Sequence, residues 1–168
     1  MDEITQALFS ASRQGNVAVL QEIFTIMKNL DVRDERGFTP LIIAAYNNQP
    51  DAVAALLEAG ATPDATDNGG NTALMGACFK GYADVARILI ERGAGLNAQH
   101  GNGGTALMFA AMFGRNELVD ILIENCADIT LADSRSLTAL DLARQQGNND
   151  AVEKLEKVAA NLPKPIAS

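Results

Sequence analysis

Apolar positions recur in this chain at a fixed interval of 33 residues. The segment from Gly103 to Ala111 reads GGTALMFAA, and related segments begin at Gly70, Gly37 and Ser136. The threonines at positions 39, 72, 105 and 138 keep this register without an insertion. A fixed period of this size predicts a stack of similar small units. The units are expected at about residues 4–36, 37–69, 70–102, 103–135 and 136–160, within a single domain covering residues 1–160.

Each unit is predicted to contain two helices followed by a turn-rich segment. In the unit 37–69, Thr39 is suited to cap the first helix and Pro40 to occupy its first turn. Apolar residues then follow at helical spacing. Gly60 is expected to end the second helix in the left-handed conformation. Residues 61–69 are rich in Pro, Asp, Asn and Gly, which predicts a finger-like turn.

Cys126 stands where the second and third units have Gly60 and Gly93. A residue with a Cβ in a left-handed position costs about 1 kcal/mol or more. Either Asn125 takes up the turn or Cys126 is strained, and drift is a simpler explanation of this cysteine than a redox role.

The two terminal units are expected to present polar surfaces to water. In the first unit, which departs from the common pattern, the polar residues are Arg13, Gln14 and Gln21. In the last unit a charged helix is predicted to cap the stack. Its inward-facing residues are expected to be Val152, Leu155 and Val158. Residues 161–168 are predicted to form a flexible tail.

The repeated segments resemble the ankyrin repeat, through Thr39-Pro40-Leu41, Ala44-Ala45, Gly60-Ala61, Gly93-Ala94 and Ala127-Asp128. The resemblance covers about residues 4–160, although the histidine of the family's core motif is replaced by Ile42, Met75, Met108 and Asp141. It implies an all-α ankyrin-repeat solenoid of five stacked helix-turn-helix units with β-turn fingers. The Thr-Ala-Leu-Met variant looks like small bacterial ankyrin proteins, some of which are similar to catalase-associated accessory proteins in haem supply, others to immunity proteins or host-directed effectors.

Composition narrows the functional classes. The 168 residues are 48% hydrophobic but only 5% aromatic, with no Trp, which favours a core of small and aliphatic side chains. A net charge of −8 argues against nonspecific binding to nucleic acid or an anionic membrane. The N-terminus shows no secretory signal, and two cysteines make no disulfide framework. A cytoplasmic monomer is expected.

No catalytic constellation is found in the sequence. His100 is the one histidine, so a histidine-based triad or metal cluster is excluded. It is expected to be a surface turn residue, and Cys78 an inert buried thiol. Recurring acids such as Asp64 and Asp67 are expected to cap turns rather than bind metal. We therefore expect no enzyme, no metal site and no cofactor.

The resemblance implies that a partner binds on the concave face, formed by the first helices and the finger tips. Tyr46, Phe79 and Met112 occupy one position in three successive units, with Phe38 and Phe113 beside them. Stacking would align them into an exposed stripe typical of an interface centre. The alternative is that each ring lies over its neighbour and only packs the inner helices. The predicted partner-binding residues are Arg36, Phe38, Tyr46, Asn71, Phe79, Lys80, Met112, Phe113 and Arg135.

Charge gives the second pattern on this face. The 26 positions assigned to it by register hold five basic residues and one acidic residue, a net charge of +4. Because the whole chain has a net charge of −8, the remaining positions together carry −12. Complementarity predicts a protein partner with an apolar patch rimmed by carboxylates. The alternative is that these charges are scattered and solvated.

The sequence thus predicts a non-enzymatic module for protein–protein interaction. The alternatives are a catalase-associated accessory protein in haem supply, for which His100 or Met112 would be the axial ligand, and an inhibitor or immunity protein that blocks a partner enzyme.

Overall fold

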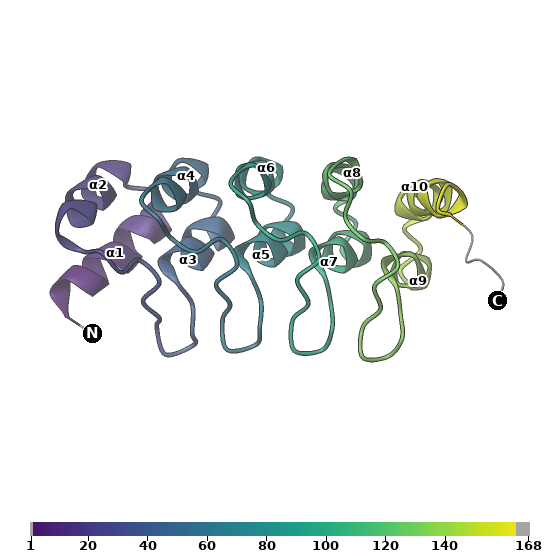
Figure 1. The fold of residues 1–168 in the computed structure, drawn as a ribbon, viewed down its shortest axis with the longest axis horizontal. Helices are drawn as coiled ribbons and strands as arrows, with labels where there is room; N and C mark the ends of the chain where they lie inside the picture. The colour runs from purple at the N-terminus through teal and green to yellow at the C-terminus, as the bar shows by residue number, and fades with distance from the viewer. Residues whose placement is uncertain (1, 164–168) are drawn as a thin grey trace.

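The computed structural model describes residues 2–163, which form ten helices arranged as five antiparallel pairs in a row (Figure 1). The inner helices are α1 (Glu3–Gln14), α3 (Pro40–Tyr46), α5 (Ala73–Lys80), α7 (Ala106–Met112) and α9 (Ala139–Gln145). The outer helices are α2 (Val17–Ile26), α4 (Pro50–Glu58), α6 (Ala83–Glu91), α8 (Asn116–Glu124) and α10 (Asn149–Ala160). The all-α solenoid of five stacked units is confirmed, with β-turn fingers between successive pairs.

Buried threonines start the inner helices, as the sequence predicts. The hydroxyl oxygens of Thr39, Thr72 and Thr105 each accept the backbone N–H three residues ahead at 3.3 Å. These threonines are between 0% and 2% exposed. Thr138 makes the same cap, and the backbone N–H of Thr138 in turn donates to the Asp141 carboxylate at 2.9 Å. Each cap satisfies a donor that would otherwise be unpaired at a helix start.

The helices pack in two parallel series. The inner helices contact one another in the order α1, α3, α5, α7 and α9, and the outer helices follow the same order behind them. Leu41, Leu74 and Leu107, one per unit and 33 residues apart, are all at most 1% exposed. The core is therefore continuous along the stack, and each unit buries its apolar face only against its neighbours.

Backbone hydrogen bonds tie the fingers into a row. The N–H of Asn68 donates to the carbonyl of Arg36 at 3.3 Å. The N–H of Gly101 donates to Gly69 O at 3.0 Å, and that of Ser134 to Asn102 O at 2.9 Å. Each bond joins one finger to the next, so the fingers form a continuous wall below the inner helices (Figure 1).

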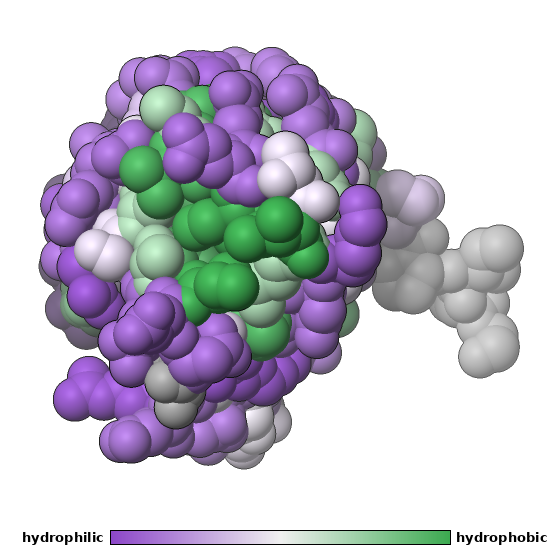
Figure 2. Space-filling model, turned by 90° about the vertical axis from the view of Figure 1, so that its left-hand side faces the viewer, coloured by the Kyte–Doolittle hydropathy of each residue, from purple (hydrophilic) through white to green (hydrophobic). Residues whose placement is uncertain are grey.

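The N-terminal end of the stack is less polar than expected. Arg13, Gln14 and Gln21 are exposed, as predicted. However, hydrophobic residues gather in the middle of this end, framed by hydrophilic ones (Figure 2), and Ile4 and Ile26 are 44% and 65% exposed. The expectation of a polar face is wrong here, because apolar side chains of α1 and α2 have no neighbouring unit on this side within the described residues.

The C-terminal end carries the expected cap. Leu155 of α10 is fully buried, whereas Lys154 and Lys157 pair with carboxylates at the surface. Residues 164–168 of the predicted flexible tail lie outside the described part of the chain. Among the described helices, none is long and apolar enough to cross a membrane.

Cys126 occupies the left-handed conformation itself, with φ of 64°. Asn125 has φ of −91° and uses its side-chain amide to donate to the Ile121 carbonyl at 2.8 Å. Of the two alternatives from the sequence, uptake of the turn by Asn125 is wrong, and Cys126 itself holds the left-handed position, where strain is expected.

We predict that Cys126→Gly raises the free energy of unfolding by up to about 1 kcal/mol, because glycine adopts this conformation without a Cβ clash. The measurement is the urea midpoint against wild type. Cys126→Ala is the control, since it removes the thiol but keeps the Cβ. An equal gain in both variants would assign the effect to the thiol.

Candidate protein-binding groove

The predicted aromatic residues lie where the short inner helices end, facing the finger row. Tyr46 is the last residue of α3, Phe79 precedes the last residue of α5, and Phe113 is the C-cap of α7. Because the units stack in register, these helix ends follow one another along the molecule. We call the space between these helix ends and the fingers the groove.

The rings form one connected run across three units. Tyr46 and Phe79 stack with their centroids 6.3 Å apart, and Phe79 meets Phe113 edge-on at 4.8 Å. Tyr46 and Phe113 are each 42% exposed, whereas Phe79 is half-buried. Both alternatives from the sequence therefore hold in part: the rings pack on one another, and the two ends of the run stay open to solvent.

Phe109 is a groove residue that the sequence prediction missed. Its ring lies 6.4 Å from Phe79, 6.5 Å from Phe113 and 5.4 Å from the imidazole of His100. It extends the aromatic run toward the third finger. The sequence did hold a signal for it: Phe109 lies 33 residues after Gly76, so a ring in one unit faces a position without a side chain in the unit before it.

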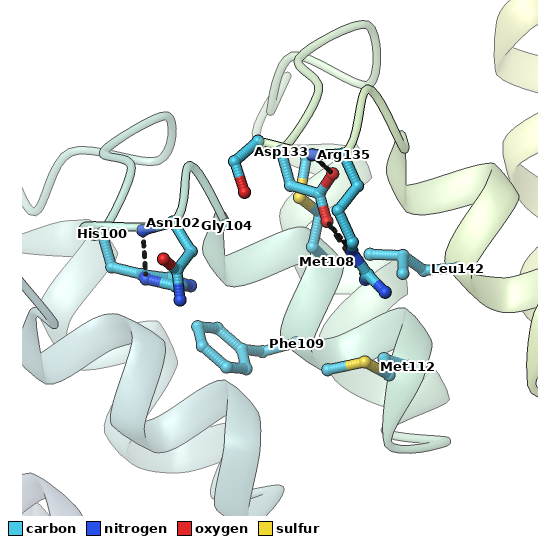
Figure 3. A pocket seen from close by; sticks show the side chains of 10 residues that line it. His100, Asn102, Gly104, Met108, Phe109, Met112, Asp133, Arg135 and Leu142 are labelled. Atoms are coloured by element: carbon cyan, nitrogen blue, oxygen red, sulfur yellow. Dashed lines mark hydrogen bonds and ion pairs between the residues drawn. The ribbon is translucent and has the colours of Figure 1, made fainter.

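Two hollows open along the groove and share Phe109 as a wall. The first, of about 300 Å³, is lined by Phe38, Ile42, Tyr46, Gly76, Phe79 and neighbouring residues, and we call it the tyrosine hollow. The second, of about 380 Å³, lies between the third and fourth fingers and is lined by His100, Asn102, Met112, Ser134, Arg135 and others; we call it the arginine hollow (Figure 3). Met112 thus faces the arginine hollow, while Phe113 takes the place in the aromatic run that was expected for Met112.

The arginine hollow has polar walls above an apolar floor (Figure 3). On one wall the guanidinium of Arg135 binds Asp133 Oδ2 at 3.2 Å. On the other wall His100 Nδ1 accepts the backbone N–H of Asn102 at 3.1 Å, so a neutral imidazole carries its proton on Nε2. Phe109 and Met112 lie below them.

Apart from Arg135, the basic side chains assigned to this face form no ion pair within the described residues. Among the described residues, Arg13, Arg33, Arg36 and Lys80 pair with no carboxylate, whereas the cations of the outer helices do. Lys80 lies 5.0 Å above the centroid of the Tyr46 ring, a cation–π contact. Arg33 binds the carbonyls of Gly37 and Thr66 within the finger row.

The nine predicted residues do not form one contact cluster. Tyr46, Phe79, Lys80 and Phe113 come together in the ring contacts. Phe38 and Asn71 line the tyrosine hollow, where both Asp67 carboxylate oxygens accept from the Asn71 amide at 3.1 Å. Met112 and Arg135 line the arginine hollow. Arg36 lies exposed at a finger tip, and in the described part of the chain its guanidinium forms no hydrogen bond, ion pair or cation–π contact with the other eight.

The comparison with known families agrees with this architecture. A family model described as ankyrin repeats in three copies matches residues 8–100 and 93–163. The chain belongs to the ankyrin repeat family.

Named relatives share only short segments with this ankyrin repeat protein. The NF-kappa-B inhibitor delta of Mus musculus is 47% identical over 45 residues, which are 27% of this chain and 14% of that protein. The human ankyrin repeat and SOCS box protein 3 is 36% identical over 52 residues, 31% of this chain and 10% of that protein. The matches thus span a small part of each relative. Ankyrin repeats typically serve as non-enzymatic interaction modules. Both relatives are mammalian, so the bacterial affiliation stays a prediction.

Finger acids of this ankyrin protein serve as turn caps. Asp34 accepts the N–H groups of Arg36 and Phe38, and Asp133 those of Arg135 and Leu137, all within 3.0 Å. No group of three or more potential metal ligands occurs in the described part of the chain. Cys78 is fully buried, and burial raises the pKa of its thiol, which suits the predicted inert core residue.

Capping bonds also make the ankyrin stack sensitive to acid. The N–H of Leu137 holds the pKa of Asp133 below its ordinary value of 3.8, with further contributions from Arg135. A lowered folded-state pKa gives stability that is present above the unfolded value and is lost as the pH falls through the folded value.

We predict that Asp133→Asn lowers the urea midpoint at about pH 7 and that this deficit shrinks as the pH is lowered below 3.8, because the wild-type carboxylate loses its charge as the pH falls through its lowered pKa. The asparagine Oδ1 still accepts both N–H groups, so the variant isolates the charge. Urea titrations at neutral pH and below pH 3.8 check this. A deficit of equal size at both would assign the effect to geometry instead of charge.

Proposed function

We propose that this protein is a non-enzymatic interaction module that binds a protein partner in its groove. The residues that carry binding in this proposal are Arg36, Phe38, Tyr46, Asn71, Phe79, Lys80, Met112, Phe113 and Arg135. In this proposal the protein acts as a monomer in the cytoplasm. A net charge of −8 makes nucleic acid and anionic membranes poor partners.

The connected aromatic run is the observation that carries the proposal. Tyr46 and Phe113, at its two ends, are two of the five large hydrophobic side chains that remain exposed in the described residues. Exposed aromatic side chains beside cavities supply most of the energy at interface centres, because they bury much area at little entropic cost.

Charge supports an acidic rim on the partner. Lys80 and Arg36 pair with no carboxylate in the described residues; Lys80 lies over the Tyr46 ring, and Arg36 is exposed on the first finger. A partner with carboxylates around an apolar patch would satisfy these cations on contact. Because such rim charges are solvated, they would raise the association rate more than the affinity.

Inhibition of the partner is one form this interaction would take. One relative carries the name of an NF-kappa-B inhibitor, and a groove occupied by an enzyme's active-site segment would block that enzyme. The matched 45 residues are little more than one 33-residue unit, however, so the general interaction module remains the proposal.

The first experiment is an affinity pull-down from native lysate with mass spectrometry. Wild type is compared with a Tyr46→Ala, Phe79→Ala, Phe113→Ala variant whose fold is checked by circular dichroism. We expect a partner that wild type recovers and this variant loses, since the variant removes the centre of the aromatic run.

A matched control is Ile4→Ala, Ile26→Ala, which also removes exposed hydrophobic side chains, but at the N-terminal end of the stack. The control is expected to recover the partner like wild type. Equal recovery by all three proteins would place binding outside the groove and contradict the proposal.

Haem supply is supported by one observation: His100 and Met112, the candidate axial ligands, both line the arginine hollow. If it is the function, titration of haem into the protein shifts the Soret band, and His100→Ala together with Met112→Ala abolishes the shift. An unchanged spectrum in wild type would exclude this alternative.

A further inference from the structure

Two glycines of the groove, Gly76 and Gly104, are not required by a positive φ. Most glycines at the turns of this stack have positive φ, which side chains disfavour, but Gly76 and Gly104 do not. Gly76 stands inside α5, where glycine destabilises a helix relative to alanine. Their backbone conformations would accept any residue, so the space left by the missing side chain is what distinguishes them.

Gly76 opens the tyrosine hollow. A Cβ at this position would lie 3.2 Å from Cδ2 of Tyr46, so the ring rests against bare helix backbone. The equivalent positions in the other four units hold larger side chains, namely Ser10, Ile43, Phe109 and Leu142. The cavity therefore exists in this unit because the unit departs from the common pattern.

Gly104 opens the arginine hollow in the same way. A Cβ here would lie 2.4 Å from Nε2 of His100, so the imidazole occupies the space of the missing side chain. The equivalent positions hold Phe38, Asn71 and Leu137. His100 itself replaces the aspartate found at positions 34, 67 and 133. Two substitutions in one finger thus produce this hollow.

The two hollows differ in chemistry. Aromatic and aliphatic side chains form most of the lining of the tyrosine hollow, and two of its polar members, Asp67 and Asn71, already bond to each other, which suits an apolar group. The arginine hollow presents Arg135, whose side chain is 63% exposed, while its partner Asp133 is only 11% exposed. Asp133 already accepts two backbone N–H groups and the guanidinium. An incoming group therefore meets spare N–H donors of the guanidinium, and these match a carboxylate.

We propose that the groove recognises a linear peptide segment that carries a large apolar side chain and, further along, an acidic side chain. The apolar residue occupies the tyrosine hollow and the carboxylate binds Arg135 in the arginine hollow. Phe109 lines both hollows, so one continuous segment spans them. This inference rests on the proposed function. It adds the chemistry of the partner and the order of its two anchoring side chains along the stack.

The experiment selects binders from a phage-displayed library of random dodecapeptides on immobilised wild-type protein. The expected sequences combine one large apolar residue with Asp or Glu several positions away. A synthetic peptide of the enriched sequence then provides the probe, and fluorescence anisotropy gives its Kd. No enrichment, or enrichment without this pair of residues, overturns the proposal.

Variants of the two glycines test each hollow separately. Gly76→Leu fills the tyrosine hollow and is expected to weaken binding by about tenfold or more, the usual effect of losing one buried anchor. Gly76→Ala, which favours the helix, places a smaller obstruction there if the leucine variant fails to fold. Gly93→Asn is the control: a Cβ at Gly93 meets nothing within 4 Å, and asparagine is among the side chains that best tolerate its positive φ of 90°. A folded Gly93→Asn variant should leave the Kd unchanged.

Arg135→Gln tests the carboxylate site at an exposed position, where folding is not at risk. It is expected to weaken the acidic peptide about tenfold but to leave unchanged the peptide whose acidic residue is replaced by its amide. Equal effects on both peptides would overturn the carboxylate assignment. Gly104→Asn, which displaces the imidazole, should act in the same direction as Arg135→Gln.

The Tyr46→Ala, Phe79→Ala, Phe113→Ala variant separates the two levels of inference. If it abolishes binding while the glycine and arginine variants do not, the groove binds its partner but the two-hollow assignment is wrong. If the selected peptide binds this variant as tightly as wild type, both the assignment and the proposed groove function fail.

Discussion

The shortness of the inner helices is the constraint on which the whole structure depends. From α3 to α9 these helices have only seven or eight residues, and helices below about 12 residues are marginal on their own in water. Each is held by a threonine cap at its start, buried in all but α9, and by the inner helices that flank it, of which α9 has one within the described residues. A unit therefore has no independent existence, and stacking in strict 33-residue register is a condition for folding, not a consequence of it.

The groove inherits its geometry from that register. Tyr46 and Phe79 each lie seven residues after an equivalent threonine cap, so they lie next to each other once their units stack. The fingers below are fixed to one another by a backbone bond at each step. A binding surface built in this way is ordered before any partner arrives, and little conformational entropy remains to be lost on association.

The sequence predicts the features that repeat in every unit, and it does not predict the features that depend on how the units pack. Caps, turns and the repeat are local patterns, so Thr39, Pro40 and the left-handed Cys126 were predictable. The exchange of roles between Met112 and Phe113 depends on which way each side chain leaves the last turn of α7, which no local pattern determines. Phe109, Gly76 and Gly104 were missed because a consensus describes what units share, while a cavity arises where one unit differs. The apolar middle of the N-terminal end is also a property of the assembled surface.

The ion pairs explain how an acidic protein can present a positive groove. Arg87, Arg92 and Lys154 on the outer helices each bind a carboxylate of a neighbouring unit. Exposed pairs of this kind add little to stability, but they neutralise the cations of the outer surface. Lys80 and Arg36 have no such partners among the described residues, and the finger acids Asp34 and Asp67 accept backbone N–H groups of their own turns. If the groove receives an acidic segment as we propose, these unpaired cations direct its approach and the shape of the two hollows decides what stays bound.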